Sequence, residues 1–367
     1  MPKGSHILII AGDPSADRHG AALIDSLRAK RPDIRVSTLG GEALRQKANT
    51  FLYPLVGVGG FGFWEPLFKL PQFWAARRKV NDLIQKDRPD VVVPMDYYGF
   101  NIHIARLAHR NGIPVVYYIS PQVWASRPGR VKKLARVINK MLVIFPFEET
   151  LYRQAGVPVR FVGHPLLERV PLPSLESSRP TIGLLPGSRR GTVARHLPLL
   201  VQTAELLHRQ FPEARCVLFR PLEIEPAFYD PFLKRTPWIE LVTDASYDIR
   251  KSLWMAIGVS GTTALENMLL GIPMIIMYKL SRLTYWIAKS LIRVPFVGIP
   301  NLLAGKAIVP ELLQDEATPE RIAEAATPLL SDRQSRQRMR ETLLSLRATL
   351  QEGGSSRAAS EILGMIA

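Results

Sequence analysis

Residues 6–17 read HILIIAGDPSAD and contain a strand, a turn and the start of a helix. The first six residues form a short run of mostly branched apolar side chains, which is typical of a strand buried on both faces. Gly12 ends the run, and a helical pattern follows from Ser15 to Lys30. This order predicts the first unit of a parallel α/β sheet. The turn lacks the spacing G-x-G-x-x-G, which disfavours a dinucleotide cofactor.

The same alternation of strand and helix recurs along the chain. The further strand candidates are residues 91–95, 115–119, 141–145, 181–185, 216–219, 256–259 and 274–277. A Pro- and Ser-rich stretch, 165–180, interrupts the pattern and indicates a linker. We therefore expect an α/β protein with two doubly wound domains, residues 1–170 and 171–344. Ligands are expected where the strands end at their carboxyl edges, in the cleft between the domains.

Composition restricts the class of protein. An apolar share of 47% in 367 residues excludes a disordered chain. The formal net charge is +16, and residues 1–170 contribute 25 basic against 13 acidic residues, so an anionic partner is expected mainly in this half. Cys216 is the single cysteine, which rules out an internal disulfide and fits a reducing compartment. No uncharged apolar run is long enough to predict a membrane-spanning helix.

Two carboxylates follow predicted strands. Asp96 comes directly after the strand 91–95, where it has two equally weighted interpretations: a general base at a sheet edge, or a cap for the helix that starts near Asn101. In the turn that contains Asp13, a helix cap by Ser15 or Asp17 is the favoured interpretation.

Two glycine-containing loops join strands to helices in the second half. The loop PGSRRG, 186–191, suits a phosphate because glycine lets the backbone approach and Arg189 or Arg190 adds a cation; a plain turn is the alternative. The loop SGTTALE, 260–266, suits a second phosphate, and Glu266 suits a ribose diol; a capping box between Thr263 and Glu266 is compatible with both. Together the loops predict a nucleoside diphosphate site.

An aromatic and basic segment, 61–79, reads FGFWEPLFKLPQFWAARRK. Pro66 and Pro71 divide it into pieces too short for a regular core helix, and tryptophans beside basic residues are typical of an interfacial membrane segment. A core helix is the alternative. The segment 280–293 has a similar composition with a cleaner helical period, so a core position is at least as well supported there. The predicted membrane-contacting residues are Phe61, Phe63, Trp64, Leu67, Phe68, Phe73, Trp74, Arg77 and Arg78.

Metal and covalent chemistry are not indicated. The seven histidines have no metal-ligand spacing, so no metal site is expected. There is no G-x-S-x-G motif, and the single cysteine lies in an apolar strand.

Considered together, several segments resemble the lipid-A-disaccharide synthase family, whose members are inverting glycosyltransferases of the two-domain GT-B fold. The resemblance covers almost the whole chain, in family order and spacing. It implies two Rossmann-like domains facing a central cleft. Residues 1–170, completed by a C-terminal helix at about 345–367, would face the acceptor and the membrane, and residues 171–344 would bind the UDP-sugar. The matching segments are AGDPSAD, MDYYGFN, YYISPQVWASRPGRVKKL, FPFEET, FVGHP, LLPGSR, SGTTALE and IPNLLAGK.

The resemblance also implies a reaction and its residues. The family transfers 2,3-diacylglucosamine from UDP-2,3-diacylglucosamine to 2,3-diacylglucosamine 1-phosphate, with inversion, and forms the β-1′,6 disaccharide of lipid A. Asp96 matches the catalytic base, Arg189 matches the arginine at the diphosphate, and Asn301 matches a cleft asparagine needed for activity. The implied substrate-binding residues are Asp13, Ser188, Ser260, Gly261, Thr262 and Glu266. No cofactor is implied.

The chain departs from the family pattern at its first turn and in the Asp96 loop. Asp13 stands where the family has Glu, and Ala16 stands where it has Gly. Gly99 stands where many members have a second acidic residue. The shorter side chain of Asp13 weakens the implied substrate-binding role at that position. Gly99 indicates that the second carboxylate is dispensable or that the chain belongs to a divergent branch.

The implied partners are the two lipid substrates and an anionic membrane surface. The implied location is cytoplasmic, peripheral on the inner face of the inner membrane of a Gram-negative-type bacterium, with a homodimer left open. A nucleic-acid partner is disfavoured, because neither a reading helix nor a basic and aromatic sheet is evident. The alternatives are other GT-B UDP-sugar enzymes, with a different lipid acceptor or with 2-epimerase activity.

Overall fold

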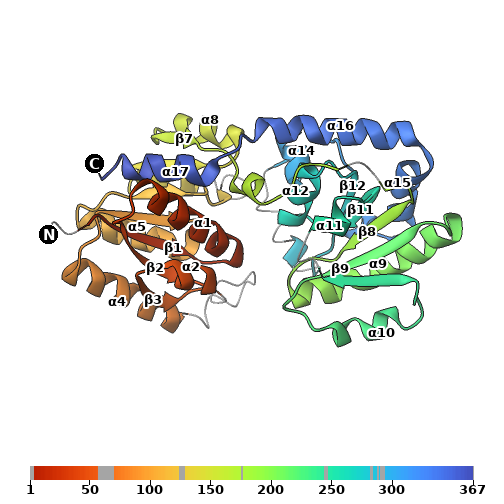
Figure 1. Ribbon diagram of the computed structural model, residues 1–367, viewed down its shortest axis with the longest axis horizontal. Helices are drawn as coiled ribbons and strands as arrows, with labels where there is room; N and C mark the ends of the chain where they lie inside the picture. The colour runs from red at the N-terminus through yellow and green to blue at the C-terminus, as the bar shows by residue number, and fades with distance from the viewer. Residues whose placement is uncertain are drawn as a thin grey trace. The chain divides into compact units, whose positions relative to one another are not determined.

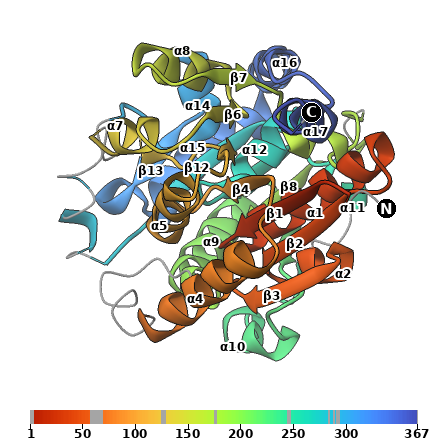
Figure 2. The ribbon, with the colours of Figure 1, turned by 90° about the vertical axis from the view of Figure 1, so that its left-hand side faces the viewer.

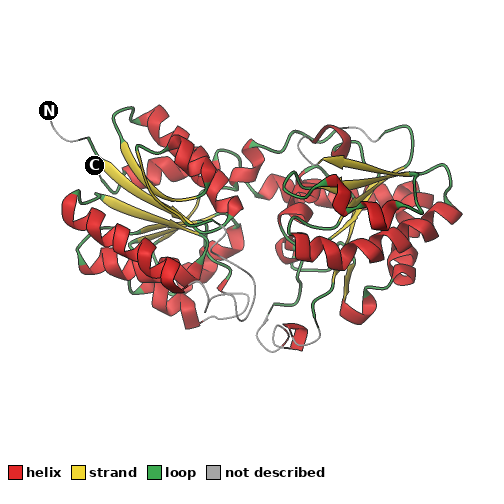
Figure 3. Ribbon diagram, turned by 90° about the horizontal axis from the view of Figure 1, so that it is seen from below, coloured by secondary structure: helices red, strands yellow, loops and turns green. Residues whose placement is uncertain are grey.

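The structure is a computed structural model that describes residues 4–56, 70–123, 129–174, 177–243, 247–281, 284–286, 289 and 294–366. The chain divides into two compact units, which are described separately. The first unit comprises Met1–Glu168 and Leu350–Ala367, and the second comprises Arg169–Thr349. Figure 3 shows each unit as a layer of strands with helices on both faces.

The first unit contains a parallel sheet in the strand order β3-β2-β1-β4-β5-β6-β7. This order is that of the Rossmann fold, in which the chain starts at the centre and winds outward in both directions. Every residue of β1 is buried, because helices cover both faces of the sheet. The strands are β1 (His6–Ala11), β2 (Arg35–Gly40), β3 (Thr50–Pro54), β4 (Val91–Met95), β5 (Val116–Tyr118), β6 (Lys140–Val143) and β7 (Val159–Phe161).

The helices of the first unit lie in two layers. Figure 2 shows α4, α5 and α7 on one face of the sheet and α1, α2 and α17 on the other. The last helix, α17, packs along α1, as Figure 1 also shows. The helices are α1 (Pro14–Lys30), α2 (Glu42–Lys47), α4 (Leu70–Lys86), α5 (Tyr98–Arg110), α7 (Gly129–Ala135), α8 (Pro146–Gln154), the 3-10 turn η1 (Pro165–Glu168) and α17 (Gly354–Leu363).

The second unit repeats this plan with the strand order β10-β9-β8-β11-β12-β13, also parallel. Helices α9 and α15 pack together over a core of buried aliphatic residues. The strands are β8 (Thr181–Leu185), β9 (Arg215–Arg220), β10 (Ile239–Thr243), β11 (Met255–Gly258), β12 (Met274–Tyr278) and β13 (Glu311–Leu313). The helices are α9 (Arg190–Gln210), η2 (Pro226–Phe228), α10 (Asp230–Leu233), α11 (Tyr247–Arg250), α12 (Thr262–Leu269), α14 (Ile299–Ala304), η3 (Gln314–Glu316), α15 (Pro319–Ser331) and α16 (Arg333–Thr349).

The predicted α/β class with two doubly wound, parallel sheets is confirmed. One local expectation is wrong for residues 70–79: they are not too short a piece for a regular helix, because they belong to the 17-residue helix α4, in which Pro71 lies near the start. Pro71 is its second residue, in the first turn. There the missing N–H of proline costs no helical hydrogen bond. Among the helices that the structure describes, none is long and apolar enough to cross a membrane.

Candidate active site

Asp13 and Asp96 meet at the carboxyl edge of the first sheet. The last residue of β1, Ala11, pairs with the last residue of β4, Met95, so the two following turns leave the sheet side by side. The Asp13 carboxylate is among the groups that raise the pKa of Asp96, so the two side chains lie near each other at this edge.

The surroundings of Asp96 favour its protonated form. Desolvation, the carboxylate of Asp13 and, at longer range, the carboxylate of Glu148 raise the pKa of Asp96 well above its usual value. Glu148 is itself buried and accepts a hydrogen bond from the backbone N–H of Phe145 at 3.2 Å. A carboxyl group whose pKa is raised in this way is a stronger base when it ionises.

The backbone at this edge is strained. Asp96 has a φ of 51° and Ile119, which follows β5, has a φ of 62°. A β-branched residue with positive φ is a clear outlier, and such strain clusters at functional sites. Hydrogen bonds maintain the conformation: the N–H of Asp96 donates to the carbonyl of Ile119 at 3.0 Å, and the Tyr117 hydroxyl donates to the carbonyl of Asp96 at 2.7 Å.

Asp13 also caps α1. Its carboxylate accepts from the backbone N–H groups of Ser15 and Ala16 at 2.9 and 3.0 Å. The expectation that Ser15 or Asp17 fills this position is wrong. Asp17 is buried and instead accepts from N–H groups around the start of α2, those of Gly41 at 2.6 Å and Leu44 at 3.2 Å among them.

In the second unit, two loops leave neighbouring strands at the same edge. The last residue of β8, Leu185, pairs with the last residue of β11, Gly258. The helices that follow, α9 and α12, begin at Arg190 and Thr262 with no side-chain hydrogen bond at their N-cap residues. Their first N–H groups are therefore not occupied by a side-chain cap, and two adjacent helix N-termini suit the two phosphates of a diphosphate.

The loop residues differ in exposure and bonding. Ser188 and Arg189, which precede α9, are exposed, as are Gly261 and Thr262 at the start of α12. The hydroxyl of Ser260 donates to the carbonyl of Val297 at 2.9 Å, so it holds the loop in place.

Glu266 is fixed by a buried arginine. Its carboxylate accepts from Arg250 at 2.6 Å and from the Tyr247 hydroxyl at 2.9 Å, and the Arg250 side chain is 1% exposed. The Glu266 side chain remains 17% exposed. The predicted capping box with Thr263 does not form, because α12 begins at Thr262 with Gly261 as its N-cap residue.

Asn301 is fully buried. Its amide nitrogen donates to the carbonyl of Val309 at 2.9 Å and to the carboxylate of Glu311 at 2.7 Å. Its amide oxygen accepts from the N–H groups of Ile308 and Val309 at 2.8 and 3.0 Å. All of its hydrogen-bonding capacity is used within the protein, so in this arrangement Asn301 positions the loop between α14 and β13 and does not face a cleft.

The predicted membrane residues fall into three groups. Phe61, Phe63, Trp64, Leu67 and Phe68 lie outside the described residues. Phe73 is partly buried and stacks on Phe100 at 5.5 Å between ring centroids, so part of its ring packs within the unit and its membrane contact stays a prediction. Trp74 is 68% exposed, Arg78 is exposed, and the Arg77 guanidinium lies 5.8 Å from the Trp74 ring.

The core interpretation of the segment 280–293 is wrong for Trp286. Its side chain is 67% exposed, and the ammonium group of Lys289 lies 5.8 Å from its ring. Within the part of the chain that the structure describes, no group of three or more His, Cys, Asp and Glu residues could hold a metal ion. Cys216 is buried in β9, and desolvation raises the pKa of its thiol to about 12.

Two residues of the site were not predicted from the sequence. Glu148 lies at the start of α8. As the acidic residue after FPF it gave a local signal for a helix cap, but no indication that it acts on Asp96. Arg250 lies sixteen positions before Glu266, and only the fold brings the two together. Arg250 lies among polar and charged residues, Asp248 and Lys251 among them, so no signal for it was present in the sequence.

Two parallel sheets wound by helices on both faces, with ligand loops at the strand ends, define the GT-B class of nucleotide-sugar enzymes. Solved structures of this class cover nearly the whole chain. They include UDP-GlcNAc 2-epimerase from Neisseria meningitidis (TM-score 0.61, 13% identity, 98% of each chain) and a glycotransferase of kitacinnamycin (TM-score 0.63, 17% identity, 99% of this chain and 100% of that chain). At these identities the likeness shows the fold.

The sequence model of the family Lipid-A-disaccharide synthetase matches residues 7–365. The lipid-A-disaccharide synthase of Geobacter metallireducens is 39% identical over 98% of this chain and 97% of its own. That of Chromobacterium violaceum is 37% identical over 97% of this chain and 96% of its own. The chain belongs to the lipid-A-disaccharide synthetase family, and it is a hexosyltransferase of lipid A synthesis.

Proposed function

We propose that the chain transfers 2,3-diacylglucosamine from UDP-2,3-diacylglucosamine to the 6-hydroxyl of 2,3-diacylglucosamine 1-phosphate, with Asp96 as the general base. The observation that carries this assignment is the desolvated carboxyl group of Asp96, which lies beside Asp13 at the ends of β4 and β1 and has a strained backbone. The alternative positions for a base are less suited, because Glu266 is neutralised by Arg250.

The reaction is a single in-line displacement. Ionised Asp96 removes the proton of the acceptor 6-hydroxyl as its oxygen attacks C1 of the donor sugar. The bond from C1 to the diphosphate oxygen breaks on the opposite face, and its electron pair leaves with UDP. The configuration at C1 is inverted, and Asp96 carries the proton until solvent removes it.

The leaving diphosphate develops negative charge, which the second unit is suited to stabilise. The first turns of α9 and α12 supply N–H donors at the end of two paired strands. Arg189 adds a guanidinium to the same edge, and Ser188, Gly261 and Thr262 line it. Fixed donors of this kind lower the barrier because they need no reorganisation as the charge forms.

Two further residues act through their neighbours. Arg250 and Tyr247 hold the Glu266 carboxylate in place for the ribose diol of the donor. Asn301 is a positioning residue, since it ties the end of α14 to β13 and leaves no polar atom for a substrate. The hydroxyl of Ser260 likewise supports the loop before α12.

The first unit is the part of the chain that contacts an anionic membrane. Residues 1–170 hold most of the net charge, and α4 presents exposed Trp74 beside Arg77 and Arg78. Both substrates carry acyl chains, so an enzyme that acts on them benefits from a membrane surface. We place the chain peripherally on the cytoplasmic face of the inner membrane of a Gram-negative-type bacterium.

Mass spectrometry of the products tests the reaction and the base together. With both lipid substrates, the purified chain is expected to release UDP and form a disaccharide 1-phosphate. Asp96→Asn keeps the size of the side chain and removes the base, so turnover should fall by at least about 100-fold while UDP binding stays unchanged. Asp25→Asn, an exposed change on α1, is the matched control.

Two outcomes would contradict the proposal. Near-normal turnover by Asp96→Asn would exclude Asp96 as the base. Conversion of the UDP-sugar to an epimer without any acceptor would replace the transferase with an epimerase.

A further inference from the structure

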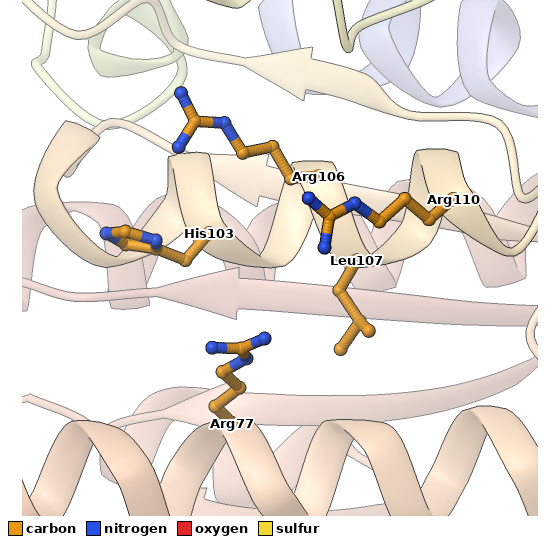
Figure 4. A pocket seen from close by; sticks show the side chains of 5 residues that line it. All are labelled: Arg77, His103, Arg106, Leu107 and Arg110. Atoms are coloured by element: carbon orange, nitrogen blue, oxygen red, sulfur yellow. The ribbon is translucent and has the colours of Figure 1, made fainter.

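A cavity of about 180 Å³ lies between α4 and α5, away from the strand ends. It is lined by Arg77, His103, Arg106, Leu107 and Arg110. In Figure 4, Arg77 extends from α4 toward α5, which carries the other four residues. A cavity of roughly 150 Å³ is large enough for a six-carbon ring, so this one can hold a phosphate group with its ester carbon.

The lining follows one face of α5. Residues 103, 106, 107 and 110 have the spacing i, i+3, i+4 and i+7, which places them in a single stripe. α5 starts beside Asp96, and at 1.5 Å per residue Arg110 lies about 18 Å along the helix from Tyr98. The stripe therefore extends away from the candidate active site.

Among the described residues, no carboxylate neutralises the positive charge of this cavity. None of the described carboxylates forms an ion pair with Arg77, Arg106 or Arg110, and no Asp or Glu lines the cavity. Arg106 and Arg110 are like charges four residues apart, an arrangement that destabilises a helix. Desolvation and then the guanidinium groups of Arg106 and Arg77 lower the pKa of His103, so both arginines act on the same imidazole.

We propose that Arg77, His103, Arg106 and Arg110 form a binding site for one phosphate ester. An anion there would offset the mutual repulsion of the cations, and the planar donor fork of arginine matches phosphate oxygens in pairs. Leu107 supplies an apolar wall for the carbon next to the ester oxygen. The site stands independently of the proposed hexosyl transfer.

The ester has two plausible sources, a lipid headgroup and a soluble metabolite. Exposed Trp74 lies one helical turn before Arg77 on α4 and its ring contacts the Arg77 guanidinium, which favours the lipid. The two sources share the same recognition chemistry, and the test separates them.

The first arm measures the pKa of His103 by NMR with and without glycerol 1-phosphate. Bound phosphate is expected to raise the pKa by about one unit, because it places an opposite charge beside the imidazole. Since the signal comes from His103 itself, phosphate bound to the loops of the second unit does not contribute. Arg110→Gln, at an exposed position, and Arg106→Lys, which keeps the charge and loses the fork, should each reduce this shift.

The second arm measures sedimentation with phosphatidylcholine vesicles that do or do not contain phosphatidic acid. Arg45→Ala is the matched control, because it removes one exposed arginine of the same unit outside the cavity. If glycerol 1-phosphate shifts His103 in a manner that depends on Arg106, the site takes a soluble ester. If only vesicles with phosphatidic acid bind, and Arg106→Lys and Arg110→Gln weaken that binding several-fold more than Arg45→Ala, the ester is a lipid headgroup.

Two results overturn the site. One is an unchanged His103 pKa with glycerol 1-phosphate together with vesicle binding that does not depend on phosphatidic acid. The other is an equal loss of vesicle binding in Arg45→Ala and the cavity variants, which would reduce the effect to net charge.

Discussion

Asp96 combines three properties that one residue rarely has: a left-handed backbone, a desolvated carboxyl group and a second carboxylate nearby. The last two make ionisation of Asp96 harder. If Asp96 is the base, as we propose, it works only above its raised pKa, so desolvation and the Asp13 carboxylate together set the lower pH limit of activity.

Asp13→Asn is expected to move the acidic limb of the pH profile of kcat to lower pH. The substitution removes the nearest negative charge from Asp96 and so lowers its pKa, which leaves more of the base ionised at a given acidic pH. Asparagine is as good an N-cap residue as aspartate, so α1 keeps its cap.

The profile is measured for the wild type, Asp13→Asn and Asp25→Asn, the last being an exposed carboxylate of α1. Only Asp13→Asn should shift the limb. An unchanged limb, or one that moves to higher pH, would mean that Asp13 does not control the ionisation of Asp96.

Among the strands, most inner ones were predictable, whereas the edge strands and the inner strand β2 were not. The predicted bounds of β1, β4 and β8 agree with the structure residue for residue, because each is a run of apolar side chains buried on both faces. β7 and β13 have only three residues each and none that is fully buried. Edge strands of this kind have no periodic or apolar signal to detect.

The residues of the candidate site also fall into those that local sequence predicted and those that it did not. Asp96 was predictable as a candidate because it follows a strong strand, and the loops before α9 and α12 because they join a strand to a helix. The partners that set the ionisation of these groups, Glu148 for Asp96 and Arg250 for Glu266, lie far along the chain. Their positions depend on tertiary packing, which a single sequence does not specify.

The loop before α12 depends on one glycine. Gly261 has a φ of 126° and a ψ of −153°, a backbone conformation that residues other than glycine essentially never adopt. Gly261→Ala has free space for its Cβ, so its cost is backbone strain alone, about 1–3 kcal/mol. We expect a lower melting temperature and weaker UDP binding, measured by calorimetry.

Gly129→Ala is the matched control, since it has equal space and an ordinary backbone at the start of α7. It should leave the melting temperature unchanged or slightly higher. Unchanged UDP binding in Gly261→Ala would show that the first turn of α12 does not hold the diphosphate.

At the scale of the whole molecule, the proposed membrane contact depends on the excess positive charge and on the exposed tryptophans. Residues 1–170 account for +12 of the net charge of +16. Trp74 in the first unit and Trp286 in the second are almost equally exposed, at 68% and 67%. The two units therefore differ in net charge, whereas their exposed tryptophans are equivalent.

Trp74→Ser should weaken binding to anionic vesicles about tenfold or more, because burial of a large apolar side chain contributes roughly 1.5–3 kcal/mol. Binding should also fall as salt is raised, since the charges involved are exposed. Co-sedimentation with Trp286→Ser as the matched control checks both expectations. A loss confined to Trp286→Ser would move the membrane contact to the second unit.

The return of the chain to the first unit has a consequence for protein synthesis. Met1–Glu168 is completed as a unit only by Leu350–Ala367, where α17 packs against α1 and buries Ala358, Ala359 and Ile362. A ribosome therefore releases the whole second unit before the last helix of the first one exists. Until α17 is made, the side of α1 that it contacts stays uncovered, so the first unit is finished only after the second has been synthesised.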